Sequence, residues 1–399
     1  MNKLFEKHHK KISAISLDFV RGIMNEIHWN ARLIGIKGAR GVGKTTLLLQ
    51  YIKQHFADSG EALYVNLDDI WFSHNRLVEL ADNFVKQGGT HLFLDEVHKY
   101  EDWSREIKNI YDDYPELYIV FTGSALLEIL DAKADLSRRA VVYHMQGLSF
   151  REFLNFTLNT DFRIFNLKEI LQDHIQLSGE ILQTIKPVKY FETYLQKGYY
   201  PFFNEVPELY HARIEEVLNM IIYIELPLLR NVDIHFATKL KQLLLIISES
   251  APFIPNIKKI SEKIGINRNT LISYLHYLEE CGIILNLYRN KKGISRMQKP
   301  DKIFLENTNI AFSVNTSVPD RGNLRESFFY NQLKYRHHLT YPVDVDFMVD
   351  DTWFFEIGGK NKKYNQINEL TEEKTFFGID NIEYGHKNRI PLWLFGFLY

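Results

Sequence analysis

The chain of 399 residues carries 48 basic and 50 acidic side chains, and its formal net charge of -2 excludes a general electrostatic attraction to nucleic acid or acidic membrane. Its 45% of hydrophobic residues can bury the cores of two or three domains, and its single cysteine, Cys281, excludes an internal disulfide. No apolar run is long enough to span a membrane, and the Lys- and His-rich residues 1–11 are unlike a secretory signal. We therefore expect a cytoplasmic protein.

Through residues 1–150, short apolar runs alternate with amphipathic stretches of helical period. We predict strands at residues 33–36, 62–67, 92–95, 117–121 and 140–145. Helices are predicted at residues 45–56, 75–87, 103–111 and 125–130. This alternation is typical of an α/β fold in which helices cover both faces of a parallel sheet, and it predicts one such domain over residues 1–150.

A glycine-rich loop joins the first predicted strand to the first predicted helix. It reads Gly38-Ala39-Arg40-Gly41-Val42-Gly43-Lys44-Thr45-Thr46. Its glycines let successive backbone N–H groups approach a phosphate without a Cβ in the way, and the helix N-terminus adds partial positive charge. Lys44 would reach the β- and γ-phosphates, the Thr45 hydroxyl would hold Mg²⁺, and Thr46 could add a phosphate contact. The loop predicts a P-loop NTPase site for ATP, ADP and Mg²⁺.

Two acids end the strand predicted at 92–95, at the edge where an α/β sheet presents ligands. We expect Asp95 to join Thr45 at the Mg²⁺ ion or to contact its water, and Glu96 to orient and deprotonate the attacking water. Two acids at a strand end, taken alone, are equally explained as helix caps. The glycine-rich loop upstream favours the catalytic interpretation.

The strand predicted at 117–121 ends in Thr122-Gly123-Ser124, where the hydroxyl of Thr122 or Ser124 could sense the γ-phosphate. The alternative is a strand-to-helix turn in which Ser124 caps the helix. Arg138 and Arg139 follow, and phosphoryl transfer often uses an arginine to neutralise transition-state charge. We take Arg139 as the catalytic candidate, with Arg138 and ordinary surface exposure as the alternatives.

Residues 151–237 show a helical pattern that starts with a capping box formed by Ser149 and Glu152. The segment Gly198-Tyr199-Tyr200-Pro201 ends a helix with clustered aromatic side chains. We interpret these aromatics as packing between helices rather than as stacking on bases.

Residues 238–299 follow the order helix, helix, turn, helix, hairpin, which is typical of a winged helix. Helices are predicted at 243–248, at 257–264 and from residue 267 to Gly282, and a strand at 283–288 leads into a turn at 290–293. Basic residues outnumber the acids nearby and suit DNA phosphates: Lys258, Lys259, Lys263, Arg268, Arg289, Lys291, Lys292, Arg296 and Lys299. Glu279 and Glu280 oppose such contacts, so protein docking or a purely structural role is the alternative to DNA.

Residues 300–399 begin a small α/β domain with three acids that match a metal-dependent nuclease site. Glu326 lies on a predicted helix, and Asp346 and Glu356 lie on predicted strands, where acids could hold Mg²⁺. The lysine of such a site is missing, because Gly358 occupies the expected position and Lys360 lies one strand repeat later. We expect a nuclease-like domain without nuclease activity.

The chain resembles, over nearly its whole length, the predicted AAA+ superfamily ATPases of bacteria and archaea, in which a P-loop AAA domain precedes a conserved C-terminal domain of unknown function. The resemblance rests on the glycine-rich loop and on segments near residues 94–108, 121–124, 136–153, 198–201, 302–307 and 346–356. Arg138 and the pair Glu306-Asn307 depart from the family pattern. The resemblance implies ATP binding and hydrolysis and says little about the client.

Two classes of function stay open at this point. The first is an ATPase switch or motor whose helical and winged-helix parts move with the γ-phosphate. The second is a nucleotide-stabilised module that binds DNA or protein with little turnover. Glu96 favours the first, because a pure binder has no need of a water-activating acid. An arginine acting between subunits would make the protein an oligomer.

Overall fold

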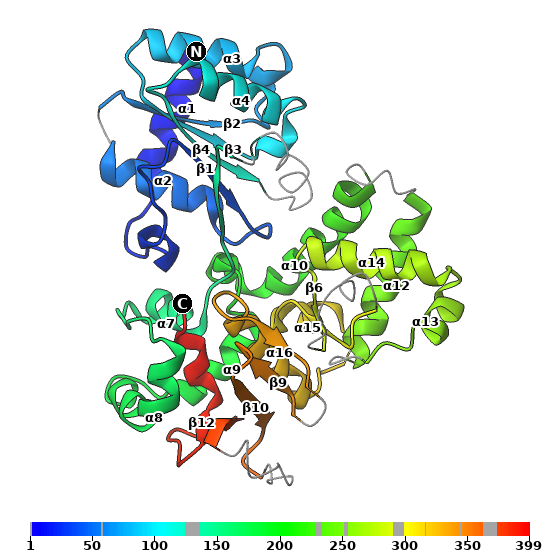
Figure 1. The fold of residues 1–399 in the computed structure, drawn as a ribbon. Coiled ribbons are helices and arrows are strands. Elements are labelled where there is room, and N and C mark those ends of the chain that lie inside the picture. The colour runs from blue at the N-terminus through cyan, green and yellow to red at the C-terminus, as the bar shows by residue number, and fades with distance from the viewer. Residues whose placement is uncertain are drawn as a thin grey trace. The chain divides into compact units, whose positions relative to one another are not determined.

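The computed structural model describes residues 2–56, 59–123, 136, 138–227, 234–250, 254–289, 299–315, 317–342, 345–361 and 373–399. The chain divides into two compact units, Met1–Gly147 and Leu148–Tyr399 (Figure 1). The predicted boundaries at residues 150, 237 and 299 stay predictions. In the described part of the chain, no helix combines the length and apolar character that a membrane crossing needs, and the cytoplasmic location likewise stays a prediction.

The first unit is built on a five-stranded sheet in which every pair of neighbours is parallel, in the order β2-β3-β4-β1-β5. The strands are β1 (Leu33–Lys37), β2 (Ala62–Asn66), β3 (His91–Asp95), β4 (Tyr118–Gly123) and β5 (Val141–His144). Continuous apolar runs such as the buried one in β1 suit strands that are covered on both faces. The predicted α/β fold class is confirmed, with strands at nearly the predicted bounds.

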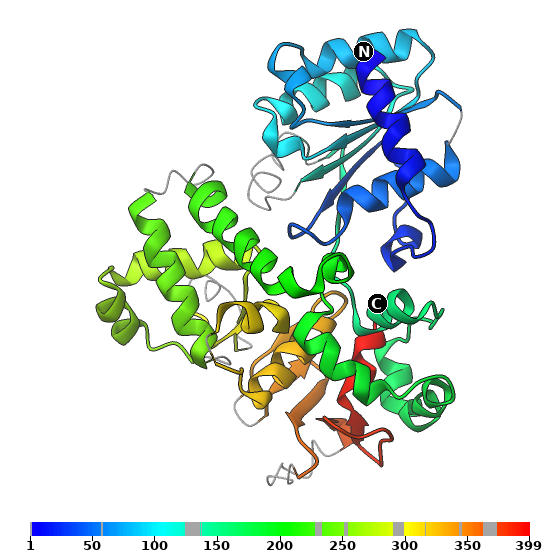
Figure 2. The ribbon, with the colours of Figure 1, turned by 180° about the vertical axis from the view of Figure 1, so that it is seen from behind.

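Helices cover both faces of this sheet: α1 (Asn2–Ala14), α2 (Lys44–His55), α3 (Leu77–Lys86) and α4 (Trp103–Asp113). Figures 1 and 2 show α3 and α4 on one face and α1 with α2 on the other. The strand order explains why α2 lies opposite α3 and α4: with right-handed connections, the crossing from β1 to β2 runs in the opposite direction to the two that follow. The helix predicted at 125–130 lies outside the described residues.

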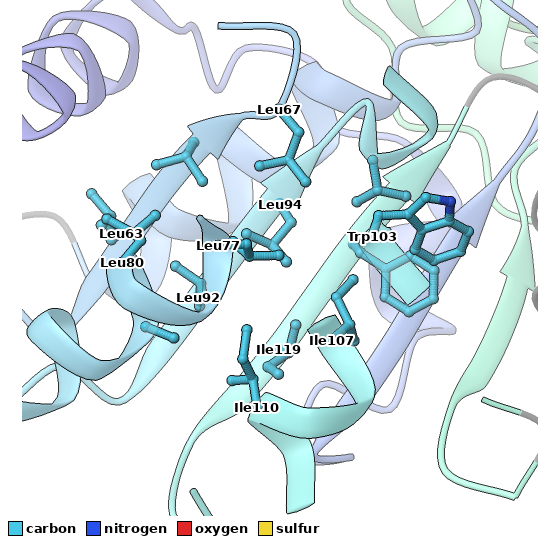
Figure 3. Packing of buried hydrophobic residues seen from close by; sticks show 14 of the residues in the cluster. Leu63, Leu67, Leu77, Leu80, Leu92, Leu94, Trp103, Ile107, Ile110 and Ile119 are labelled. Atoms are coloured by element: carbon cyan, nitrogen blue, oxygen red, sulfur yellow. The ribbon is translucent and has the colours of Figure 1, made fainter. Parts of the chain in front are cut away.

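On the face covered by α3 and α4, side chains from the strands and from the helices interdigitate and form a hydrophobic core (Figure 3). Leu63, Leu92 and Ile119 come from three neighbouring strands, and Leu80 and Ile110 come from the two helices. All five side chains are almost fully buried. This packing fixes the carboxyl ends of β3 and β4, where the candidate site lies.

The second unit begins with helices and ends with a mixed sheet. Its first helices are α7 (Phe150–Leu158), α8 (Leu167–Leu182), α9 (Pro187–Lys197) and α10 (Tyr210–Met220). The start of α7 is the predicted capping box: the Ser149 side chain accepts from the Glu152 N–H, and the Glu152 side chain accepts from the Ser149 N–H. Each side chain satisfies a backbone donor that the first helical turn leaves open.

Three helices and an antiparallel strand pair follow: α12 (Ile234–Ser250), α13 (Ile257–Ile264), α14 (Arg268–Glu280), β6 (Ile284–Leu287) and β7 (Lys302–Leu305). This is the element order on which the winged-helix interpretation rests. The predicted turn at 290–293, with Lys291 and Lys292, lies outside the described residues. Strand β7 lies beyond residue 299, so the β6–β7 pair spans the boundary predicted between the winged-helix domain and the C-terminal domain.

The chain ends in a five-stranded mixed sheet of order β12-β11-β10-β9-β8. Two helices precede this sheet, α15 (Thr308–Val314) and α16 (Arg321–Leu333). The strands of the sheet are β8 (Leu339–Thr340), β9 (Phe347–Val349), β10 (Trp353–Gly358), β11 (Thr375–Ile379) and β12 (Arg389–Pro391). Helix α16 packs against β10 and against the 3-10 helix Leu392–Phe397. Phe329 of α16 lies in ring contact with Phe347, Phe355 and Phe395, so aromatic packing joins the helix to the sheet.

Candidate functional site

The glycine-rich loop lies between β1 and α2 and has the backbone conformation that its glycines permit. Gly41 and Gly43 have φ angles of 83° and 99°, values that a residue with a Cβ rarely adopts. A Cβ built on Gly38 would lie 2.1 Å from the Met145 carbonyl oxygen, which is too close for any side chain. The loop therefore requires glycine at these three positions.

Lys44 is the first residue of α2 and its side chain is buried. Its Nζ donates hydrogen bonds of 2.9 Å to the carbonyl oxygens of Gly38 and Ala39. The ammonium group therefore lies under the loop, where it offers positive charge to an anion bound by the loop's N–H groups.

Asp95 ends β3 and is almost fully buried, with its carboxylate surrounded by three hydroxyl donors. The hydroxyls of Thr45 and Tyr64 each donate to Oδ2 at 2.7 Å, and the Thr122 hydroxyl donates to Oδ1. Thr45 and Asp95 thus bring two hard oxygen ligands together beside the loop, which is the donor set that Mg²⁺ prefers. The residues present fit a magnesium ion shared with a bound phosphate.

Glu96 follows Asp95 in the left-handed conformation, with a φ of 55°. Its N–H donates to the Thr122 hydroxyl at 3.2 Å, and its Oε2 lies 3.5 Å from His98 Nε2. Burial, aided by the charges of Lys99, Lys44 and Arg40, lowers the pKa of His98 to about 3. His98 is therefore neutral at neutral pH, and its contact with Glu96 is not an ion pair.

Five further residues were predicted as candidates for this site. Thr122 is fully buried on β4, and its hydroxyl bonds to Asp95 and to the backbone of Glu96. Ser124 lies outside the described residues. The Arg139 guanidinium donates from Nε and Nη2 to the two carboxylate oxygens of Asp112, both at 3.0 Å, and Arg138 is exposed. Thr46 is exposed on the first turn of α2.

Two residues that support the site went unpredicted. Arg21 is buried and donates to the Val42 carbonyl at 2.8 Å and to the Gln146 and Gly147 carbonyls at 2.9 Å, so it ties the loop to the chain after β5. Tyr64 lies on β2, and burial followed by the nearby Asp95 charge raises the pKa of its hydroxyl, which therefore stays a donor. No sequence pattern marks either residue, because both act across the tertiary fold.

In the second unit, the segments that carry the family resemblance form a buried polar network. Asn309 Oδ1 accepts from the N–H groups of Gly198 and Tyr199, both at 2.9 Å, and the Tyr199 hydroxyl donates to Glu306 at 2.8 Å. Tyr199 and Tyr200 are buried, which agrees with the packing interpretation of the aromatic cluster. These residues connect the end of α9 to α15.

Comparison with known families gives two partial matches. Residues 30–154 match the family model of an AAA domain, and residues 188–317 match that of a domain of unknown function, DUF8612. The first match contains the glycine-rich loop, Asp95 and Glu96. It supports a nucleotide-binding domain of the AAA type in the first unit.

Two uncharacterised proteins of Methanocaldococcus jannaschii are similar in sequence. One is 27% identical over 291 residues, which are 68% of this chain and 60% of the relative, and the other is 24% identical over 367 residues, 85% of this chain and 76% of the relative. The chain thus spans 60% of the length of the first relative.

Solved structures show a distant likeness. The Walker-type ATPase of Pyrococcus abyssi is 13% identical with a TM-score of 0.41, over 77% of this chain and 95% of that chain. The ORC1 protein of Aeropyrum pernix in complex with DNA is 13% identical with a TM-score of 0.31, over 77% of this chain and 90% of that chain. Scores this low carry no argument about function.

Proposed function

We propose that the first unit binds ATP with Mg²⁺ and hydrolyses it to ADP and phosphate. The observation that carries the proposal is the 2.7 Å hydrogen bond between the Thr45 hydroxyl and Asp95, formed directly beside a loop that requires glycine at three positions. Loop N–H groups and Lys44 would hold the triphosphate, and Thr45 with Asp95 would hold the metal. Bound Mg²⁺ would neutralise charge on the β- and γ-phosphate oxygens.

Glu96 is the proposed general base, because its carboxylate is partly exposed while its backbone is fixed by Thr122. Because His98 is neutral at neutral pH, its 3.5 Å contact with Glu96 is not an ion pair, and a carboxylate at this position could accept a proton from water. We assign Thr122 to positioning Asp95 and Glu96, and the γ-phosphate contact that the sequence suggests for it remains an alternative.

Substitutions in the site test this proposal. Lys44→Ala should abolish ATP binding in calorimetry, whereas Lys53→Ala, a lysine farther along α2 that donates to the Ile15 carbonyl, should leave it intact. Glu96→Gln should keep ATP affinity and lower phosphate release by about 10²–10⁴-fold, the usual contribution of a general base. Unchanged affinity in Lys44→Ala would remove the loop from the proposal, and normal turnover in Glu96→Gln would remove the base.

The second unit is the proposed output of the nucleotide cycle, as a switch or motor whose client is DNA or a protein. Exposed lysines and an arginine on α13 and α14 favour DNA phosphates: Lys258, Lys259, Lys263 and Arg268. The alternative is a nucleotide-stabilised binding module with little turnover. The same phosphate-release assay, run with and without duplex DNA at low salt, separates the two, because a switch couples turnover to its client and a module does not turn over.

A further inference from the structure

The acids predicted for a nuclease-like site lie in the second unit, on three separate segments. Glu326 lies on α16, Asp346 lies just before β9, and Glu356 lies on β10. The cation that such a site needs was predicted to be missing, because Gly358 stands two residues after Glu356. Among the described residues, no group of three or more His, Cys, Asp or Glu side chains is placed to hold a metal ion.

A lysine from elsewhere in the chain supplies positive charge to these acids. Lys302, the first residue of β7, has its Nζ 2.6 Å from Glu326 Oε2 and 4.0 Å from Asp346 Oδ1. Its side chain is only 8% exposed. A buried ammonium needs a nearby carboxylate, and here two are present.

The surroundings of Lys302 fix the ammonium in this position. The Nζ lies 5.4 Å from the ring centroids of Phe304 and Tyr341 and 5.9 Å from that of Phe347, distances at which aromatic rings attract a cation. Asp346 is fixed as well, because its Oδ2 accepts from the Ile357 N–H at 2.8 Å. One carboxylate oxygen of Asp346 thus binds the backbone of β10 while the other faces Lys302.

We propose that Lys302 is a built-in counter-ion that occupies the place of a divalent metal between Glu326 and Asp346. The ammonium at 2.6 Å from Glu326 excludes a metal from the same oxygen, because two cations there would repel each other strongly in a poorly solvated site. The contacts of Lys302 with the two acids then link strand β7 to α16 and to the mixed sheet. The cluster is a structural ion-pair site, and the second unit performs no chemistry with a metal there.

Thermal unfolding of the full chain in increasing MnCl₂ tests the proposal. Wild type should show only the response of its P-loop site. Lys302→Ala should unfold at a lower temperature, and Mn²⁺ should raise that temperature by several degrees more than in wild type, because the vacated carboxylates now bind it. Adding Glu326→Gln to Lys302→Ala should abolish the extra response. An identical Mn²⁺ response in Lys302→Ala and wild type would overturn the proposal.

Lys334→Ala is the matched control, because Lys334 also pairs with a buried acid, Glu306, at 2.9 Å in the same unit. It should lose stability and gain no response to Mn²⁺. Calorimetric titration of MnCl₂ into wild type and Glu326→Gln tests whether a metal binds at Glu326, even where Lys302→Ala does not fold. Equal numbers of bound ions support the counter-ion, and loss of an ion in Glu326→Gln shows that wild type holds a metal there.

Discussion

At the scale of single residues, Asp95 shows how three hydroxyl donors orient one buried carboxylate. Oδ2 accepts from both Thr45 and Tyr64, and Oδ1 accepts from Thr122, so the side chain cannot rotate without breaking hydrogen bonds. Thr45 was predicted because it belongs to a motif with fixed spacing. Tyr64 was not, because its role depends on the pairing of β2 with β3, which no local pattern encodes.

We expect Tyr64→Phe to weaken the metal site without removing it. The substitution keeps the ring and deletes one donor to a buried carboxylate, which should lower the free energy of unfolding by about 1.5–3 kcal/mol. The Mg²⁺ concentration for half-maximal phosphate release should rise several-fold, because Asp95 is less well oriented. Tyr51→Phe is the control, since it deletes a tyrosine hydroxyl in the same unit from a ring that stacks on Trp29. A purely structural role for Tyr64 would lower stability and leave the Mg²⁺ requirement unchanged.

At the scale of elements, the predictable parts are those whose local pattern matches their final environment. Strands β1 to β4 of the first sheet are largely buried apolar runs, and the capping box of α7 is a four-residue signal. Helix α1 was missed because only Leu4, His8 and Ile12 on one narrow stripe are buried, among lysines and histidines. Strand β7 was missed because it starts with a lysine, and that lysine is buried beside Glu326 and Asp346, which lie far along the chain.

The docking of α1 should depend on pH through His8. Its Nδ1 accepts from the Tyr64 N–H at 2.9 Å, so the folded state requires the neutral ring, and burial, followed by the nearby His9, lowers the pKa of His8 from 6.5 to about 4. Above pH 6.5 the His8 ring is neutral in both the folded and the unfolded chain, so its hydrogen bond with Tyr64 contributes fully to the free energy of unfolding. As the pH falls from 6.5 to about 4, the unfolded chain takes up a proton that the folded state refuses, and up to about 3 kcal/mol is lost.

Denaturant unfolding at several pH values checks this dependence. His8→Gln keeps an acceptor of hydrogen bonds and does not titrate, so its stability should fall less steeply than that of wild type between pH 6.5 and 4. His9→Gln, on the exposed side of the same helix, removes only the smaller cause of the lowered His8 pKa, so its stability should fall with pH nearly as steeply as that of wild type. Parallel curves for His8→Gln and wild type would show that another group causes the loss.

At the scale of the whole molecule, the chain divides into two compact units. The first holds the loop, Asp95 and Glu96 within Met1–Gly147, and the second joins helices, strand pair and mixed sheet within Leu148–Tyr399. Sequence patterns predicted the nucleotide-binding loop of the first because phosphate binding needs fixed spacing. They predicted less of the second, where Asn309 and Lys302 act through tertiary contacts across many residues.

For the proposed ATPase activity, we expect the arginine to be Arg138 supplied by a neighbouring subunit, although Arg139 was the candidate taken from the sequence. Arg139 is held by Asp112 of its own chain, whereas Arg138 is exposed and can reach another molecule. Arg138→Ala should therefore lower the rate of phosphate release by about 10³-fold or more, the usual contribution of such an arginine. Arg139→Ala should lose only a partly exposed ion pair, worth about 1 kcal/mol of stability or less.

Mixing two inactive variants distinguishes an arginine in trans from one in cis. In a mixture of Arg138→Ala and Glu96→Gln, some sites combine an intact Glu96 from one chain with an intact Arg138 from its neighbour. Phosphate release should then exceed that of either variant alone and should fall on dilution as the subunits separate. An arginine acting within its own chain predicts no recovery, because every site then lacks either the base or the cation.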